Sequence, residues 1–159
     1  MGLFDFLFGK KKATLEAMDK KNDAFLSKNP VAADEENEMM RTASKLMTSR
    51  KFDESLELYK RLVEQYPAKR GLYESQIGVA YFFMGKYETA FTHYVSAMNN
   101  GGDKSMMDDN IWEAAEAYSK SEAASQGSST AHPLGLIKEY MELFPKGNHA
   151  KKAATALAK

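Results

Sequence analysis

The chain has 159 residues, of which 43% are hydrophobic, enough to bury one domain core or a short array of helical repeats. Lys and Arg number 22 and Asp and Glu also number 22, so the formal net charge of zero gives no overall attraction to nucleic acid or to an acidic substrate. The absence of cysteine excludes disulfide frameworks, thiolate metal sites and cysteine nucleophiles.

Residues 1–12 form an apolar and basic tail. Its lysines follow the apolar block, whereas a secretory signal places positive charge first, so we expect the chain to stay in the cytoplasm. One interpretation is a weak peripheral anchor on the inner membrane face, because apolar side chains can enter the interface while lysines meet anionic headgroups. The other is a tail that packs back onto the domain. The candidate membrane-contact residues are Leu3, Phe4, Phe6, Leu7, Phe8, Lys10, Lys11 and Lys12.

Residues 13–29 are expected to form an N-terminal helix, because apolar side chains recur among charges and Asn29-Pro30 then stops the pattern. The acids at 34–36 are typical of a helix start, where negative charge is favourable. Nothing nearby completes an oxygen cage around them, so we interpret them as a solvated helix start and predict no metal site.

Two helix pairs are predicted next. The first spans 36–49 and 52–66 and ends at Pro67; the second spans 72–84 and 87–98 and closes at residues 99–102. The second pair repeats the first, because Phe52 and Tyr87 are 35 residues apart (87 − 52) and so are Ser55 and Ala90 (90 − 55). A period near 34 residues built from two helices is typical of a helical solenoid.

The sequence resembles a tetratricopeptide repeat through the residues Tyr73, Ile77, Gly78, Tyr81, Gly85, Tyr87, Ala90, Tyr94 and Ala97. Residues 43–67 resemble the repeat less strictly. The resemblance implies an all-α, right-handed helix-turn-helix solenoid of about three helix pairs with a C-terminal capping helix. It also implies that Ala43 and Gly78 let the helices of one pair approach, and that Ser55 and Ala90 do so between neighbouring pairs.

A third pair is expected over 108–145, with a helix at 108–120, an elongated loop at 121–130 and a second helix that Pro133 opens and Pro145 ends. Asn148 is expected to cap a last helix rich in Ala and Lys. The predicted organisation is a tail (1–12), an N-terminal helix (13–29) and a helical domain (36–158). The domain comprises repeats at 36–70, 71–104 and 108–145 and a capping helix at 148–158.

No motif predicts catalysis. The stretch Gly101-Gly102-Asp103-Lys104-Ser105 departs from a phosphate-binding loop, because Asp103 replaces the required glycine and a helix, not a strand, precedes it. The three histidines, His93, His132 and His149, are scattered along the sequence and suggest neither a zinc set nor a catalytic pair. We therefore expect no enzyme, no cofactor and no metal.

The first helix of each pair is expected to line a concave, largely apolar groove that binds a partner's helix or peptide. Some tetratricopeptide proteins hold a C-terminal carboxylate with polar groove residues; here Met40, Ser44, Ser75 and Val79 stand at about those positions, which favours an apolar partner. The alternative is that these side chains are core or are covered by a tail of the same chain. The predicted groove residues are Met40, Ser44, Met47, Leu72, Ser75, Gln76, Val79, Phe82, Trp112 and Glu116.

These patterns favour a non-enzymatic protein–protein interaction module that binds another protein or a peptide and no nucleic acid. An adaptor, a chaperone-like protein or a sequestering inhibitor such as a bacterial immunity protein would each fit. The alternative is a membrane-peripheral scaffold, held weakly at the membrane surface by residues 3–12 while the repeats recruit a partner.

Overall fold

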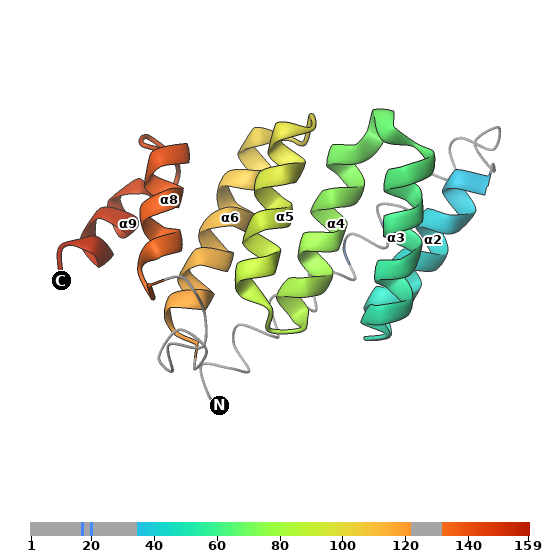
Figure 1. Ribbon diagram of the computed structural model, residues 1–159, viewed down its shortest axis with the longest axis horizontal. Helices are drawn as coiled ribbons and strands as arrows, with labels where there is room; N and C mark the ends of the chain where they lie inside the picture. Colours follow the sequence, from blue (N-terminus) through green and yellow to red (C-terminus); the bar gives the residue numbers. More distant parts are fainter. Residues whose placement is uncertain (1–16, 18–19, 21–34, 122–131) are drawn as a thin grey trace. The chain divides into compact units, whose positions relative to one another are not determined.

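A computed structural model describes Ala17, Lys20, residues 35–121 and residues 132–159. Every regular element between residues 35 and 121 and between 132 and 159 is a helix, which confirms the all-α prediction there (Figure 1). The elements are α2 (Glu35–Thr48), α3 (Phe52–Gln65), the short 3-10 helix η2 (Pro67–Lys69), α4 (Arg70–Phe83), α5 (Tyr87–Asn99), α6 (Lys104–Ser119), α8 (Gly135–Leu143) and α9 (Ala150–Leu157).

The chain divides into two compact units, Met1–Pro67 and Ala68–Lys159, which are described one at a time. Within each unit, helices that follow one another in the described sequence pack side by side in antiparallel pairs. The predicted tail (1–12) lies outside the described residues, as do the predicted loop (121–130) apart from Ser121 and the helix at 13–29 apart from Ala17 and Lys20. None of the described helices is both long enough and apolar enough to cross a membrane.

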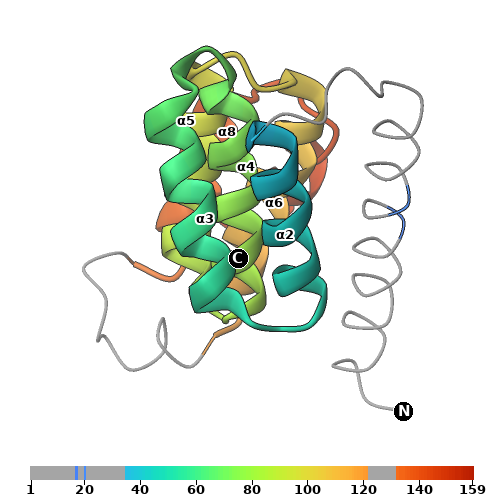
Figure 2. The same cartoon turned by 90° about the vertical axis from the view of Figure 1, so that its right-hand side faces the viewer.

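In the first unit, α2 and α3 form one antiparallel pair (Figure 2). Ala43 and Ser55 are fully buried where the helices meet, and the Ser55 hydroxyl donates a hydrogen bond of 2.8 Å to the Ala43 carbonyl. A small side chain is needed here because the two backbones approach closely. Ser55 was predicted to serve the approach of neighbouring pairs; it joins the helices of its own pair instead.

The turns inside the first two helix pairs share one conformation. Arg50 and Gly85 are 35 residues apart (85 − 50) and both adopt a positive φ, 62° and 76°. In each turn this residue's N–H bonds to the carbonyl three residues back, and the next N–H, of Lys51 or Lys86, bonds to the carbonyl five residues back, at 2.8–3.0 Å. This left-handed ending satisfies the last carbonyls of a helix and reverses the chain within a few residues.

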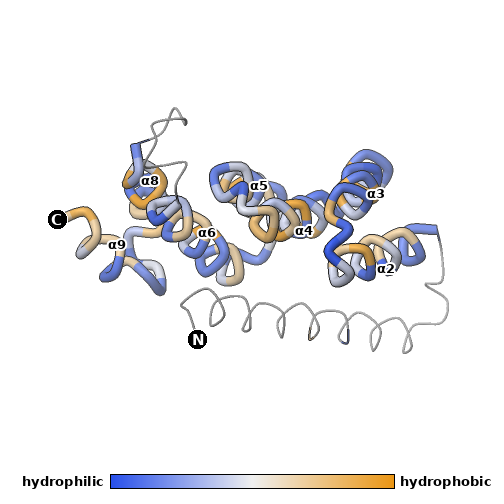
Figure 3. Tube along the Cα trace, turned by 90° about the horizontal axis from the view of Figure 1, so that it is seen from below, coloured by the Kyte–Doolittle hydropathy of each residue, from blue (hydrophilic) through white to orange (hydrophobic). Residues whose placement is uncertain are grey.

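In the second unit, α5 and α8 lie in one layer and α4, α6 and α9 in the other (Figure 3). Gly78 on α4 faces Tyr94 on α5, and a Cβ added at Gly78 would lie 2.6 Å from atoms of that ring. The predicted role of Gly78 in a close helix approach is thus confirmed. The core of this unit is built from Ala90, Phe91, Tyr94, Ala97, Met107, Ile111, Trp112, Ala114, Ala115, Tyr118, Leu136, Ile137, Tyr140, Phe144 and Ala153.

Several predicted helix ends differ from the structure. Helix α6 begins at Lys104, before the predicted 108, because the Asp103 side chain accepts a hydrogen bond of 2.9 Å from the Met106 N–H and so caps the helix. Pro133 precedes α8 by a turn and does not open it. The prediction that Asn148 caps the last helix is wrong, since His149 occupies the cap position without a side-chain cap and the Asn148 amide bonds to Asp109.

Candidate interaction surface

Helix α4 presents a mostly apolar row to solvent. Leu72, Gln76 and Val79 follow the spacing that places side chains on one side of a helix, and the opposite side carries the buried Glu74 and Gly78. Leu72 is 47% exposed, while Gln76 and Val79 are half-buried. The only charged side chain inside this helix after Arg70 is Glu74, which is 6% exposed and faces away from the row.

Helix α6 presents an acidic row. Asp109 and Glu113 are exposed and Glu116 is half-buried, again at helical spacing on the side opposite the buried Ile111 and Ala115. Glu116 pairs with Lys120 at 3.0 Å. Asp109 accepts hydrogen bonds from the Asn148 amide at 3.3 Å and pairs with the His149 Nε2 at 2.8 Å.

The two rows lie on helices that belong to the same layer of the second unit. A Cβ at Gly71 would lie 2.5 Å from the Asn100 carbonyl oxygen and 2.6 Å from the Gly102 N, so the start of α4 touches the link that leads into α6. Both helices therefore begin at the same end, and both belong to the layer opposite α5 (Figure 3). We call Leu72, Ser75, Gln76, Val79, Asp109, Glu113 and Glu116 the α4–α6 face.

Trp112 is a core residue. Its side chain is only 4% exposed, its ring stacks on His149 with centroids 5.4 Å apart, and its edge meets Tyr140 at the same distance. Phe82 is half-buried and makes edge contacts with Phe83 and Tyr87. Of the predicted groove residues in this unit, Leu72, Ser75, Gln76, Val79 and Glu116 reach the α4–α6 face, whereas Trp112 is covered by the segment before α9.

In the first unit, Met47 is 2% and Ser44 8% exposed, so both side chains are buried. Met40 is half-buried. For Met47, Ser44 and Trp112 the structure therefore agrees with the alternative interpretation of core side chains. The physical reason is that another segment of the chain covers the side of the helix on which they lie.

Two histidines that looked isolated in the sequence are paired with carboxylates. His93 Nδ1 lies 2.6 Å from Glu74 Oε2, the Tyr81 ring stacks on the imidazole at 5.3 Å, and Arg70 bonds to the other Glu74 oxygen at 3.2 Å. His149 is paired with Asp109, as above. The partners are 19 and 40 residues apart, so only helix pairing brings them together.

These pairs orient the imidazole rings. Within the described ranges, neither imidazole bonds to a Ser or Thr hydroxyl that it could activate. The described residues also contain no group of three or more His, Cys, Asp or Glu side chains that could hold a metal ion.

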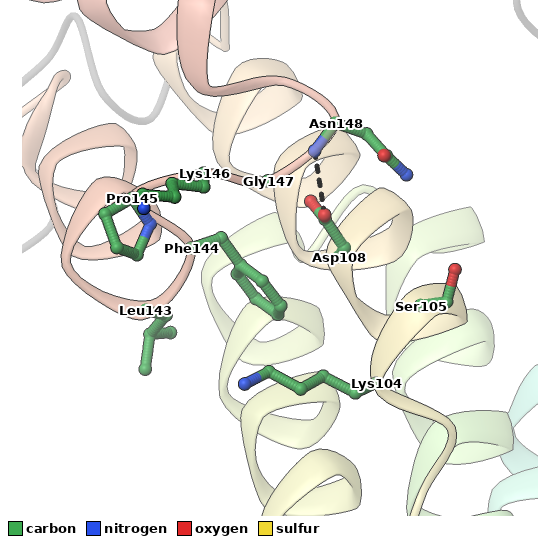
Figure 4. Close-up of a pocket in the computed structure, with 9 residues that line it drawn as sticks. All are labelled: Lys104, Ser105, Asp108, Leu143, Phe144, Pro145, Lys146, Gly147 and Asn148. Atoms are coloured by element: carbon green, nitrogen blue, oxygen red, sulfur yellow. Dashed lines mark hydrogen bonds between the residues drawn. The ribbon is translucent and has the colours of Figure 1, made fainter.

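A pocket of about 440 Å³ lies between the start of α6 and the α8–α9 link (Figure 4). Asp108 forms its inner wall, with one carboxylate oxygen 2.6 Å from the Tyr140 hydroxyl and the other 2.9 Å from the Asn148 N–H. Burial, and then this hydrogen bond, raises the pKa of Tyr140 above its ordinary value. Because both Asp108 oxygens are engaged, the carboxylate serves the fold. The remaining lining residues are Lys104, Ser105, Leu143, Phe144, Pro145, Lys146 and Gly147.

Comparison of the chain with protein-family models, with curated proteins and with solved structures found no match.

Proposed function

We propose that this protein is a non-enzymatic protein–protein interaction module built from tetratricopeptide-like repeats, and that it binds a partner polypeptide on the α4–α6 face. The repeat assignment is supported by the turns at Arg50 and Gly85, which share their φ sign and their hydrogen bonds at a spacing of 35 residues (85 − 50). The small residues at the helix contacts, Ala43 with Ser55 and Gly78 against Tyr94, add to that support.

The observation that carries the binding proposal is the row on α4. Helices on the surface of a domain usually show charged and polar side chains to water. Here the outward row carries Leu72, Gln76 and Val79 and no charge, and Leu72 leaves nearly half of its surface in water. A partner that covers such a row removes apolar surface from water, which is favourable by about 25 cal/mol per Å².

Absence of catalysis is part of the proposal. The support is chemical: the oriented imidazoles of His93 and His149 are hydrogen-bonded to carboxylates, with no Ser or Thr hydroxyl bonded to either imidazole within the described residues.

Site-specific photocrosslinking in the native host tests the function. A photoreactive benzoylphenylalanine would replace Gln76 on the α4–α6 face, and in a matched variant Thr92, which is exposed on α5 outside it. We expect a discrete protein adduct from position 76 that is absent from position 92. Adding Leu72→Asp should weaken the adduct several-fold, because it places a charge in the apolar contact.

Identical adducts from positions 76 and 92 would contradict the proposal. So would an adduct from position 76 that Leu72→Asp leaves unchanged.

A further inference from the structure

We infer that the segment bound by the α4–α6 face is a cationic amphipathic helix of another protein, with its apolar side on α4 and its Lys or Arg side chains toward α6. This inference rests on the proposed function and specifies the chemistry of the partner.

The two rows differ in charge. The α4 row is uncharged, whereas Asp109, Glu113 and Glu116 on α6 are three carboxylates at successive turns. Lys120 lies 3.0 Å from the Glu116 carboxylate and the His149 imidazole lies 2.8 Å from the Asp109 carboxylate. The chain has zero net charge, so an excess of carboxylates along one helix is a local property of this face.

The face is suited to a partner segment that is itself a helix. The backbone groups within α4 and α6 are satisfied inside the helices, so the face offers side chains and no open strand edge to an extended peptide. A partner helix satisfies its own backbone hydrogen bonds, and it needs only to match the apolar and charged rows. Since α4 has 14 residues, a helix of similar length, about 20 Å, would cover the face.

The apolar row on α4 and the acidic row on α6 contribute differently to binding. Burial of Leu72 and Val79 supplies the non-specific attraction, because it depends on apolar area alone. The exposed carboxylates add little attraction per pair, but they reject an acidic partner and speed association with a basic one, and salt screens both effects. Charge therefore determines which amphipathic helix binds.

The test uses the full chain and two synthetic amphipathic helices of about 14 residues with the same Leu face. One peptide carries Lys and the other Glu on its polar side, and fluorescence anisotropy measures the affinity of each. We expect the Lys peptide to bind about tenfold more tightly or better. Raising the salt to about 0.5 M should remove most of that preference.

A charge-reversal pair of variants locates the site. Glu113→Lys with Glu116→Lys should abolish the preference for the Lys peptide. The matched control, Glu139→Lys with Glu142→Lys, makes the same charge change at the same spacing on exposed positions of α8 and should leave the preference intact. Far-ultraviolet circular dichroism confirms that each variant keeps its helices.

Four outcomes overturn the inference. If both peptides bind equally and Leu72→Asp removes both, the interaction module stands but its preference for cations is wrong. Equal loss in the α8 control shows that binding follows overall charge. Absence of binding by either peptide removes the proposed chemistry. Sedimentation that shows a dimer lost only in the α6 variant assigns the face to a second copy of this chain.

Discussion

The Tyr140 hydroxyl on α8 donates a hydrogen bond of 2.6 Å to the Asp108 carboxylate on α6, 32 residues away. The second Asp108 oxygen accepts from the Asn148 N–H at 2.9 Å, and the Tyr140 oxygen accepts from the His149 N–H at 3.1 Å. One buried carboxylate thus joins α6, α8 and the segment that starts α9. Short links between polar groups in a low-dielectric interior hold a single arrangement of the elements that carry them.

Asp108→Ala should destabilise the protein by about 2–4 kcal/mol, because the buried Tyr140 hydroxyl and the Asn148 N–H lose a charged acceptor. Urea unfolding followed by tryptophan fluorescence is a direct measurement, since Trp112 is the sole tryptophan of the chain and touches Tyr140. Glu139→Ala, at an exposed position of α8, is the control and should change stability by about 0.5 kcal/mol or less. Equal effects of the two substitutions would contradict the role of Asp108.

Alkaline pH should destabilise the second unit. Burial raises the pKa of Tyr94 and of Tyr140 above the ordinary value of 10.0. The unfolded chain releases these protons near pH 10 while the folded chain keeps them, so the free energy of unfolding falls as pH rises above that value. Each tyrosine contributes a slope of about 1.4 kcal/mol per pH unit there, and none well below pH 10.

The variant Tyr140→Phe separates this effect from general alkaline denaturation. Its free energy of unfolding should be lower than that of the wild type at pH 8, since the hydrogen bond to Asp108 is gone, and should fall less steeply above pH 10. Urea titrations at half-unit steps of pH measure both quantities. Parallel curves for the two proteins would show that Tyr140 does not retain its proton.

Gly78→Ala should destabilise the α4–α5 contact by about 1–3 kcal/mol, because the new Cβ would lie 2.6 Å from the Tyr94 ring and overpack it. Ser75→Ala, in the same helix but away from that contact, should have a small effect. Combining Gly78→Ala with Tyr94→Leu should cost less than the sum of the two single changes, since the smaller side chain makes room. Thermal unfolding by circular dichroism measures all four proteins, and strict additivity would argue against the contact.

Substitutions at the two turn residues, Arg50 and Gly85, should change stability in opposite directions. Arg50 holds a φ of 62°, which glycine adopts without strain, so Arg50→Gly should stabilise the turn by up to about 1 kcal/mol. Gly85→Ala places a Cβ at a φ of 76° and should cost about 1–2 kcal/mol, although nothing crowds that position. Chemical unfolding measures the two changes, and effects of the same sign would refute the shared conformation.

Helix positions were predictable because apolar residues at helical spacing and a proline after the helix act within one segment of chain. The predicted start of α6 was wrong because Asp103, which departs from the phosphate-loop pattern, caps the helix with its side chain. The role of Asn148 was missed for a different reason. Its amide bonds to Asp109, 39 residues earlier, and a pattern of neighbouring residues cannot predict a contact between residues so far apart in the sequence.

Some residues of the candidate surface could likewise be predicted from the sequence and others could not. Leu72 and Val79 could be assigned to an outward row from their spacing; the structure leaves Leu72 47% exposed, while Val79 is half-buried and packs partly against the core. Trp112 has an equally suitable position in its own helix, yet His149 covers it. Which neighbour covers a side chain depends on the packing of segments that are distant in sequence.

The sequence by itself determined that the chain is helical, where most of its described helices lie, and that its second helix pair repeats the first after 35 residues (87 − 52). Each of these follows from interactions between residues a few positions apart. Only the tertiary structure decided that Met47 and Trp112 are buried, that Glu74 and Asp109 hold histidines, and that α4 and α6 share a layer. Those relations join residues on different helices, and the close packing of side chains between the helices determines them.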